Sequence, residues 1–292
     1  MLKTAEDCTG IVAGKTIKPW EAYKKSKCFF LQPRDFLQQK TTVWSFKERG
    51  EWASHTPQYR GNWSPYIIRN VLELYSSPGD LVLDPMVGGG TTPVECLLTG
   101  RNSISYDINP VSIEIVKDRL KMPILEENLP KTFHSVSVGD TRDLTLINDE
   151  SVDLIATHPP YANIIQYSES IEGDLSRMEI NDFFREYFKA INEYYRVLKN
   201  GKYCAILVGD THKKGHYVPI SNRIMLLFLE AGFILKEDII KVEWNCQSNN
   251  HYCFNTNNFL LTAHEHLYIF RKFNSNERNK YPNSSVDFLR KI

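Results

Sequence analysis

Three apolar segments of the sequence end in residues that could bind a nucleotide-like ligand. The segment 84–92 begins with an aspartate and is rich in glycine, and Gly88 and Gly90 let the backbone approach a ligand closely and adopt positive φ angles. Asp107 ends the next apolar segment, where a carboxylate can accept hydrogen bonds from both ribose hydroxyls. Asp140 follows a third apolar segment and could accept a hydrogen bond from a nucleobase amino group. Together they predict a nucleotide-binding cleft.

A different chemistry is indicated by the run His158-Pro159-Pro160-Tyr161. Two prolines fix φ and remove backbone donors, which leaves the carbonyl of Pro159 as an acceptor in a rigid loop. Neutral His158 offers a further acceptor nitrogen, and Tyr161 offers a flat face on which a base can stack. These groups suit the exocyclic amino group of a nucleobase, because two acceptors turn its lone pair toward an electrophile. Without the glycine-rich segment upstream, a packed turn would be the better interpretation.

Other binding chemistries fit the sequence less well. A nicotinamide dinucleotide fingerprint would have a third glycine at the position of Pro93, so a dehydrogenase is disfavoured. Cys246 and Cys253 lie near several histidines, but the spacing matches no common zinc site, and we expect no metal. The six cysteines contain no Cys-x-x-Cys pair and predict reduced, mostly packed thiols.

The scaffold that must bring these residues together is also indicated by the sequence. From about residue 64, short apolar segments alternate with segments of helical periodicity, which predicts an α/β fold with a mostly parallel sheet and helices on both faces. Ligands of such sheets bind beyond the carboxyl ends of the strands. The seven predicted strands are 81–83, 103–106, 136–138, 152–156, 203–208, 233–244 and 267–271, and the predicted helices are 65–75, 92–98, 183–198 and 220–230, with one more beginning at Asn109-Pro110.

Composition and charge limit the class of protein. The 292 residues are 42% hydrophobic and 24% charged, which is typical of a folded domain and excludes a mainly disordered chain. We find no apolar run near the ~20 residues of a membrane span and no secretory signal, so we expect a cytoplasmic protein without a membrane partner. The net charge is zero, yet the first sixty residues are basic. We predict an N-terminal extension over 1–60, one catalytic domain over 61–272 and a basic tail over 273–292.

Taken together, the segments 84–92 and 158–161 resemble the S-adenosylmethionine-dependent DNA amino-methyltransferases, the cytosine-N4 and adenine-N6 DNA methylases. In that family the first segment holds the cofactor, and the second is an Asp/Asn/Ser-Pro-Pro-aromatic catalytic loop. The resemblance extends from about residue 44 to 272, and residues 59–65 are similar to the segment that cradles the methionine end. It implies a Rossmann-like class I methyltransferase fold, with S-adenosylmethionine as cofactor.

The resemblance also implies a role for each matched position. Asp107 should hold the ribose, and Asp140 should lie near the adenine. His158 departs from the family, which usually has Asp, Asn or Ser there, and a protonated histidine could not accept the required hydrogen bond. The residues implied to hold the target base are His158, Pro159, Pro160 and Tyr161, and those implied to bind the cofactor are Asn62, Trp63, Asp84, Pro85, Gly88, Gly90, Thr91, Thr92, Asp107 and Asp140.

The implied substrate is double-stranded DNA with a flipped target base, and the implied partner is a cognate restriction endonuclease. Cytosine N4 is favoured over adenine N6, and a cytosine-C5 enzyme is disfavoured because the sequence contains no Pro-Cys dipeptide. A tRNA guanine-N2 methyltransferase and a non-catalytic nucleic-acid binder remain as alternatives. Candidate DNA contacts are the polar insert 245–262, the basic loop 211–216 and the N-terminal extension, which carries Trp20, Trp44 and Trp52.

Overall fold

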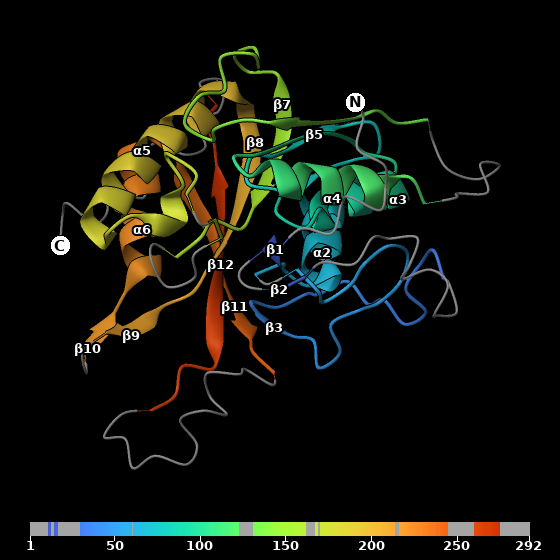
Figure 1. The fold of residues 1–292 in the computed structure, drawn as a ribbon, viewed down its shortest axis with the longest axis horizontal. Coiled ribbons are helices and arrows are strands. Elements are labelled where there is room, and N and C mark those ends of the chain that lie inside the picture. Colours follow the sequence, from blue (N-terminus) through green and yellow to red (C-terminus); the bar gives the residue numbers. More distant parts are fainter. Residues whose placement is uncertain are drawn as a thin grey trace.

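An eight-stranded sheet lies at the centre of the computed structural model, which describes residues 11–12, 15–16, 30–59, 61–122, 131–161, 167–168, 170–213, 216–244 and 260–274 (Figure 1). The strand order is β3-β11-β12-β8-β7-β4-β5-β6. Neighbouring strands are parallel except at β12, which is antiparallel to both β8 and β11. The strands are β3 (Val43–Ser45), β4 (Leu81–Asp84), β5 (Asn102–Asp107), β6 (His134–Val138), β7 (Val152–Thr157), β8 (Leu198–Val208), β11 (Ile234–Val242) and β12 (His264–Arg271).

The predicted class of fold is confirmed, and each predicted strand is present, but the sheet has one strand more than the seven expected. The additional strand is β3, which pairs in parallel with the edge strand β11. Three residues are too few to show a period in the sequence, so β3 could not be recognised there. Its central residue, Trp44, is only 1% exposed and packs in the hydrophobic core on the face of the sheet that α2 covers. Part of the expected N-terminal extension therefore completes the sheet.

Two small antiparallel pairs lie outside the central sheet. One is formed by β1 (Ile11–Val12) and β2 (Lys15–Thr16). The other is formed by β9 (Thr211–Lys213) and β10 (His216–Val218), so the segment 211–216 includes hairpin strands where a loop was predicted.

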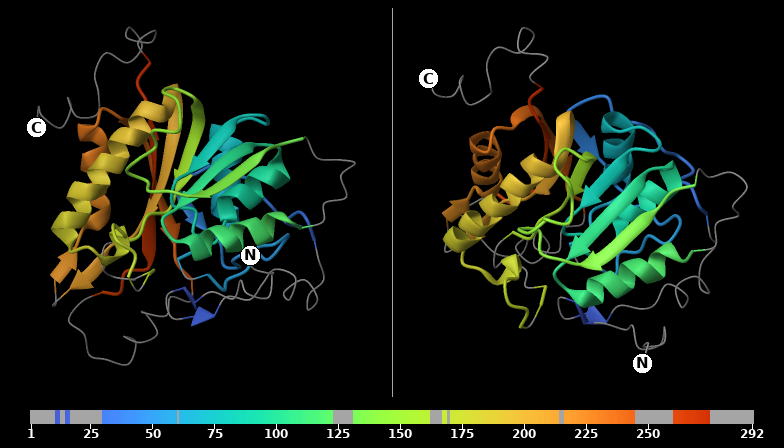
Figure 2. Two further views of the ribbon diagram at one scale, coloured as in Figure 1. Left: turned by 45° about the horizontal axis from the view of Figure 1, so that its top comes forward. Right: turned by 90° about the horizontal axis from the view of Figure 1, so that it is seen from above.

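Helices cover both faces of the sheet, as predicted (Figure 2). Leu154 packs on the same side as α2, whereas Ile155, its neighbour in β7, packs on the side of α5 and α6. This alternation follows from the two-residue period of a strand buried on both faces. The helices are α2 (Pro65–Tyr75), α3 (Thr91–Thr99), α4 (Pro110–Leu120), α5 (Ile180–Val197) and α6 (Ile220–Glu230), with a short 3₁₀ helix at Leu175–Arg177.

Two helices begin as the sequence predicted. The side chain of Ser64 accepts a hydrogen bond from the backbone N–H of Tyr66 at 3.3 Å, and that of Asn109 accepts one from Val111 at 3.0 Å. Each cap is followed by a proline at the first helical position, where no N–H is needed. Within the described residues, we find no helix with both the length and the apolar character to cross a bilayer.

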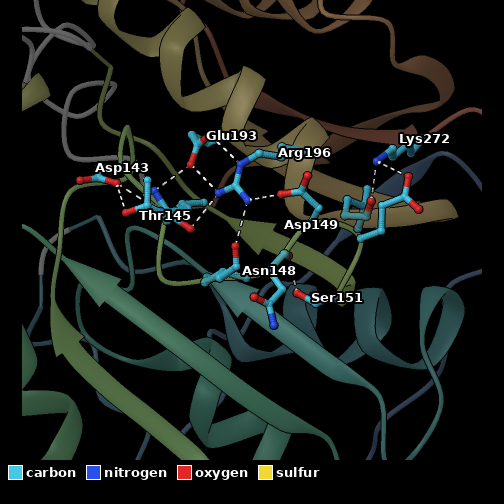
Figure 3. Close-up of polar contacts among 12 residues, drawn as sticks. Asp143, Thr145, Asn148, Asp149, Ser151, Glu193, Arg196 and Lys272 are labelled. Carbon is cyan, nitrogen blue, oxygen red and sulfur yellow. Dashed lines mark hydrogen bonds and ion pairs between the residues drawn. The ribbon is translucent and has the colours of Figure 1, made fainter.

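The segment that leads into β7 is fastened to α5 by one arginine (Figure 3). Arg196 donates to the carbonyl oxygens of Leu144 at 2.8 Å and Ile147 at 2.9 Å, and it forms ion pairs with Asp149 and Glu193. The hydrogen bonds that Arg196 donates to Glu193 and Asp149 raise the pKa of the guanidinium, so it stays charged. These contacts fix the start of the strand whose far end carries the Pro-Pro loop.

Candidate active site

A cleft lies where β4, β5 and β7 end, at the edge of the sheet that the sequence predicted. The space within it amounts to about 770 Å³, part of which is open solvent. The predicted strand ends therefore share one crevice. The expected site residues that line it are Asn62, Trp63, Asp84, Pro85, Gly88, Asp107, Asp140, His158 and Pro160.

The glycine-rich turn shapes the floor of the cleft. Gly88 has φ 50° and Gly90 has φ 84°, both in the left-handed region. A Cβ on Gly90 would lie 2.9 Å from a methyl group of Val116, so only glycine lets this turn pack against α4. Gly90, Thr91 and Thr92 are not part of the cleft lining. Gly90 caps α3, and Thr92 supports the site from behind by donating to Asp84 at 2.5 Å.

Two carboxylates in the cleft have raised pKa values. Burial raises the pKa of Asp84 to about 7, although the hydrogen bonds from Thr92 and Thr157 oppose this. Burial likewise raises the pKa of Asp107 to about 6. Asp107 accepts the backbone N–H of Gly88 at 2.8 Å and that of Asn109 at 2.9 Å, one on each oxygen. The end of β5 thus holds the glycine-rich turn, and it keeps further lone pairs for a ligand.

Asp140 lines the cleft, but its carboxylate is bound within the protein. Arg142 donates to both of its oxygens, at 2.6 Å from Nη2 and 2.9 Å from Nε. The same guanidinium contacts Glu186 on α5 and the carbonyl of Gly173. The ion pair of Asp140 and Arg142 is therefore held by α5 and by the segment before it.

His158 links the cleft to a second cavity. This cavity encloses about 780 Å³, part of it open to solvent, and Gly61, Asn62, Trp63 and His158 line both spaces. The indole of Trp63 stacks on the imidazole, with ring centres 6.1 Å apart and planes 29° apart. His158 follows directly on β7, and its side chain is 14% exposed. Burial lowers the pKa of His158 below its usual range, so the ring is neutral near pH 7.

Tyr161 turns its hydroxyl toward other protein groups. It lies 2.5 Å from Nε2 of His158 and donates to Oε1 of Glu265 at 2.7 Å. Neither cavity has Tyr161 or Pro159 in its described lining. The structure therefore places Tyr161 beside His158 and shows that its hydroxyl is engaged.

Several residues of the site were missed in the sequence. Tyr167 lines the cleft and stacks on Tyr59, which belongs to the expected segment 59–65, with ring centres 6.4 Å apart, and Asp174 lines the cleft from the segment before α5. Glu265 fell between the predicted insert 245–262 and the strand predicted to begin at Leu267, because β12 begins at His264, three residues earlier than expected. The sequence gives no signal for this earlier start, because residues 264–266 read His-Glu-His and contain no apolar residue to alternate with the polar ones.

Some sequence predictions lie outside the described residues. These include Trp20, Cys246, Cys253 and most of the insert, residues 245–259. In the part of the chain that the structure describes, we find no group of three His, Cys, Asp or Glu side chains that could hold a metal ion.

Comparison with known proteins gives one family model and a set of partial relatives. The family model described as "DNA methylase" matches residues 15–118 and 152–291. A type II methyltransferase of Methanocaldococcus jannaschii is 35% identical over 77 residues, which are 26% of this chain and 14% of that protein. A tRNA (guanine(10)-N2)-dimethyltransferase of Methanothermobacter thermautotrophicus is 29% identical over 169 residues, 57% of this chain and 46% of that protein. The chain thus spans less than half the length of either relative.

A solved structure confirms the predicted class I methyltransferase fold. It is a SAM-dependent methyltransferase from Methanosarcina mazei, which superposes with a TM-score of 0.50 at 16% identity. The match covers 70% of this chain and 97% of that one.

Proposed function

The chain belongs to the DNA methylase family, and from this premise we propose that it transfers a methyl group from S-adenosylmethionine to an exocyclic amino nitrogen of a base in DNA. The observation that carries the proposal is the position of His158, which lines both the cleft and the second cavity. An amino group held at His158 from the second cavity would face a methyl donor in the cleft. Such in-line positioning accounts for most of the catalysis expected of this reaction.

The residues that line the cleft suit the charged and polar groups of this cofactor. When bound, S-adenosylmethionine supplies a methyl group on a positively charged sulfur. Gly88 leaves room for close approach of the ligand, and Asp84 offers a buried carboxylate to the cationic methionine part. Asp107 would offer its free lone pairs to the ribose hydroxyls, and we propose that the adenine lies near Asp140, which also lines the cleft.

The target base would be held by the Pro-Pro loop. His158 and the carbonyl of Pro159 would accept the two amino hydrogens, and this draws the nitrogen lone pair toward the methyl group. A base inside a duplex cannot reach this loop, so it must be flipped out, at a cost of a few kcal/mol. Stacking on Tyr161 would offset about 1–3 kcal/mol of that cost. We propose cytosine N4 as the target, with adenine N6 as the alternative.

The surroundings of the site provide candidate contacts to the duplex and to a partner. The β9–β10 pair carries basic residues suited to phosphates, and β3 fixes part of the basic N-terminal segment at one edge of the central sheet. We propose that the protein acts beside a cognate restriction endonuclease, as the family resemblance implies.

The deciding experiment measures transfer of a tritiated methyl group from S-adenosylmethionine to double-stranded DNA and, in parallel, to tRNA. Nucleoside analysis of the labelled product then identifies the base. We expect label in N4-methylcytosine from DNA. Label only in tRNA guanine would favour the activity named for the 29% identical relative, and cofactor binding without any transfer would favour a non-catalytic binder.

Asp107→Ala is expected to weaken cofactor binding about 10- to 100-fold, because it removes a carboxylate that accepts ribose hydroxyls and fixes the glycine-rich turn. Isothermal titration calorimetry measures the affinity. Asp143→Ala, which removes an exposed carboxylate outside the cleft, is the matched control. Unchanged affinity in Asp107→Ala would remove this residue from the ribose site.

Cofactor affinity is expected to fall as the pH drops below about 7. Burial raises the pKa of Asp84 to about 7, and a protonated carboxyl no longer attracts a cationic ligand. Binding near that pH should release protons, because the ligand favours the ionised form. Calorimetry in buffers of different ionisation enthalpy measures this release, which should shrink in Asp84→Asn. An affinity that is constant between about pH 6 and 8 would contradict this role.

A further inference from the structure

A chain of polar side chains runs from the Pro-Pro loop at the end of β7 to β12 and β11, which lie beyond β8 in the sheet. Nε2 of His158 lies 2.5 Å from the hydroxyl oxygen of Tyr161, and this hydroxyl donates to Oε1 of Glu265 at 2.7 Å. The other carboxylate oxygen of Glu265 accepts from Nζ of Lys241 at 2.8 Å. Lys241 and Glu265 are direct cross-strand partners in β11 and β12, so the sheet itself sets the position of this pair.

The protons in this chain can be placed by counting donors. Burial raises the pKa of Glu265, but the charge and hydrogen bond of Lys241, the charge of His158 and the hydrogen bond from Tyr161 together outweigh it and hold the pKa well below its usual range, so Glu265 is a carboxylate. Burial raises the pKa of Tyr161, which is therefore a phenol with one proton. That proton is given to Glu265. The short contact between His158 and the tyrosine oxygen must then be donated by His158, from Nε2.

A neutral imidazole with its proton on Nε2 carries its lone pair on Nδ1. Nδ1 of His158 is buried and makes no hydrogen bond of good geometry among the described residues, although the backbone of Gly61 lies near the ring and favours its protonated form. Buried polar atoms without a partner are rare in folded proteins, and each one calls for an explanation. A ligand that supplies a hydrogen at this point would provide the missing partner.

We propose that Glu265, acting through the hydroxyl of Tyr161, selects the tautomer of His158 in which Nδ1 is the acceptor for the amino hydrogen of the target base. The proposal rests on the function proposed above. Glu265 and Tyr161 are positioning residues here, because they act on the base through His158. The family's usual Asp, Asn and Ser need no such positioning contact, because each offers an acceptor oxygen and has no tautomers to select between.

The opposite tautomer is disfavoured by the same geometry. With the proton on Nδ1, the lone pair of Nε2 would face the lone pairs of the Tyr161 oxygen at 2.5 Å, because Glu265 takes the tyrosine proton. The backbone of Gly61 favours a protonated ring, as does the charge of Glu265, while Lys241 and Arg49 oppose it. Burial is the largest of these influences, and it keeps the ring neutral.

The test is nitrogen NMR of protein labelled with ¹⁵N-histidine, which distinguishes the two tautomers directly. The chain has eight histidines, and the signal lost in His158→Asn identifies the one of interest. We expect wild-type His158 to carry its proton on Nε2. In Tyr161→Phe, which keeps the ring but removes the hydroxyl, we expect the Nδ1–H form to gain population. We also expect kcat to fall about threefold to tenfold, with unchanged cofactor affinity.

Two further variants sharpen the experiment. Glu265→Gln removes a charge that favours the protonated ring, so the pKa of His158 measured by NMR should fall further. Tyr203→Phe also removes a tyrosine hydroxyl, but from the part of β8 that is remote from the Pro-Pro loop. It should alter neither the NMR signal of His158 nor turnover. A wild-type Nδ1–H tautomer, or a Tyr161→Phe variant with unchanged tautomer and turnover, would overturn the proposal. The spectrum needs no substrate, so failure of wild type to methylate DNA would contradict the proposed function instead.

Discussion

His158→Ala is expected to lower kcat for methyl transfer by about 100-fold or more, because it removes a fixed acceptor at the reacting nitrogen. Cofactor affinity should change little, since the carboxylates at the ends of β4 and β5 remain in place. His158 reaches the cleft only at its border with the second cavity. Single-turnover transfer of tritium to DNA, with the cofactor affinity measured separately, distinguishes the two effects.

The control for this variant is His158→Asn, which puts one of the family's usual residues at this position. Asparagine restores an acceptor oxygen that needs no particular protonation state, so part of the lost activity should return. If alanine and asparagine were equally inactive, the acceptor role would be wrong and the size or stacking of the imidazole on Trp63 would be decisive. If alanine were fully active, the Pro-Pro loop would not hold the base through His158.

Glu95→Ala is expected to lower the free energy of unfolding by about 3–5 kcal/mol, because it leaves buried donors without their acceptor. Glu95 lies in α3 and is fully buried. Its Oε1 accepts from the indole of Trp52 and from Nε2 of His55, and its Oε2 accepts from Arg69, each at 2.7 Å. This carboxylate therefore fastens the chain before α2 to the helix that follows the glycine-rich turn.

Urea denaturation monitored by tryptophan fluorescence measures the loss. Glu95→Gln is the matched control: it keeps the shape and one acceptor oxygen, and it should cost less than alanine. Burial raises the pKa of Glu95, but the hydrogen bond from His55 and the charge of Arg69 outweigh this and lower it overall. Its contribution is therefore present above the unfolded pKa of about 4.3 and is lost as the pH falls below it. A loss under about 1 kcal/mol in the alanine variant would contradict the anchoring role.

The local parts of the fold could be predicted because their signals are local. The caps at Ser64 and Asn109, the turn at Gly88 and Gly90, and the strand ending in His158 are each encoded within a few residues. Alternating strands and helices then determine a mostly parallel sheet, and parallel strands end at a common edge. For this reason the cleft and the aspartates at its strand ends follow from spacing, whereas Asn62 and Trp63 were expected from the family resemblance.

The sequence by itself determined which residue types stand at the strand ends, and with them the chemistry that the site offers. Tertiary structure decided which of those groups are free to act. The hydroxyl of Tyr161 is bound by Glu265, 104 positions away, and Asp140 is held by Arg142, which also reaches Glu186 on α5. Such partners depend on strand order and register, which bring distant segments within 3 Å of each other and leave no periodic trace in the chain.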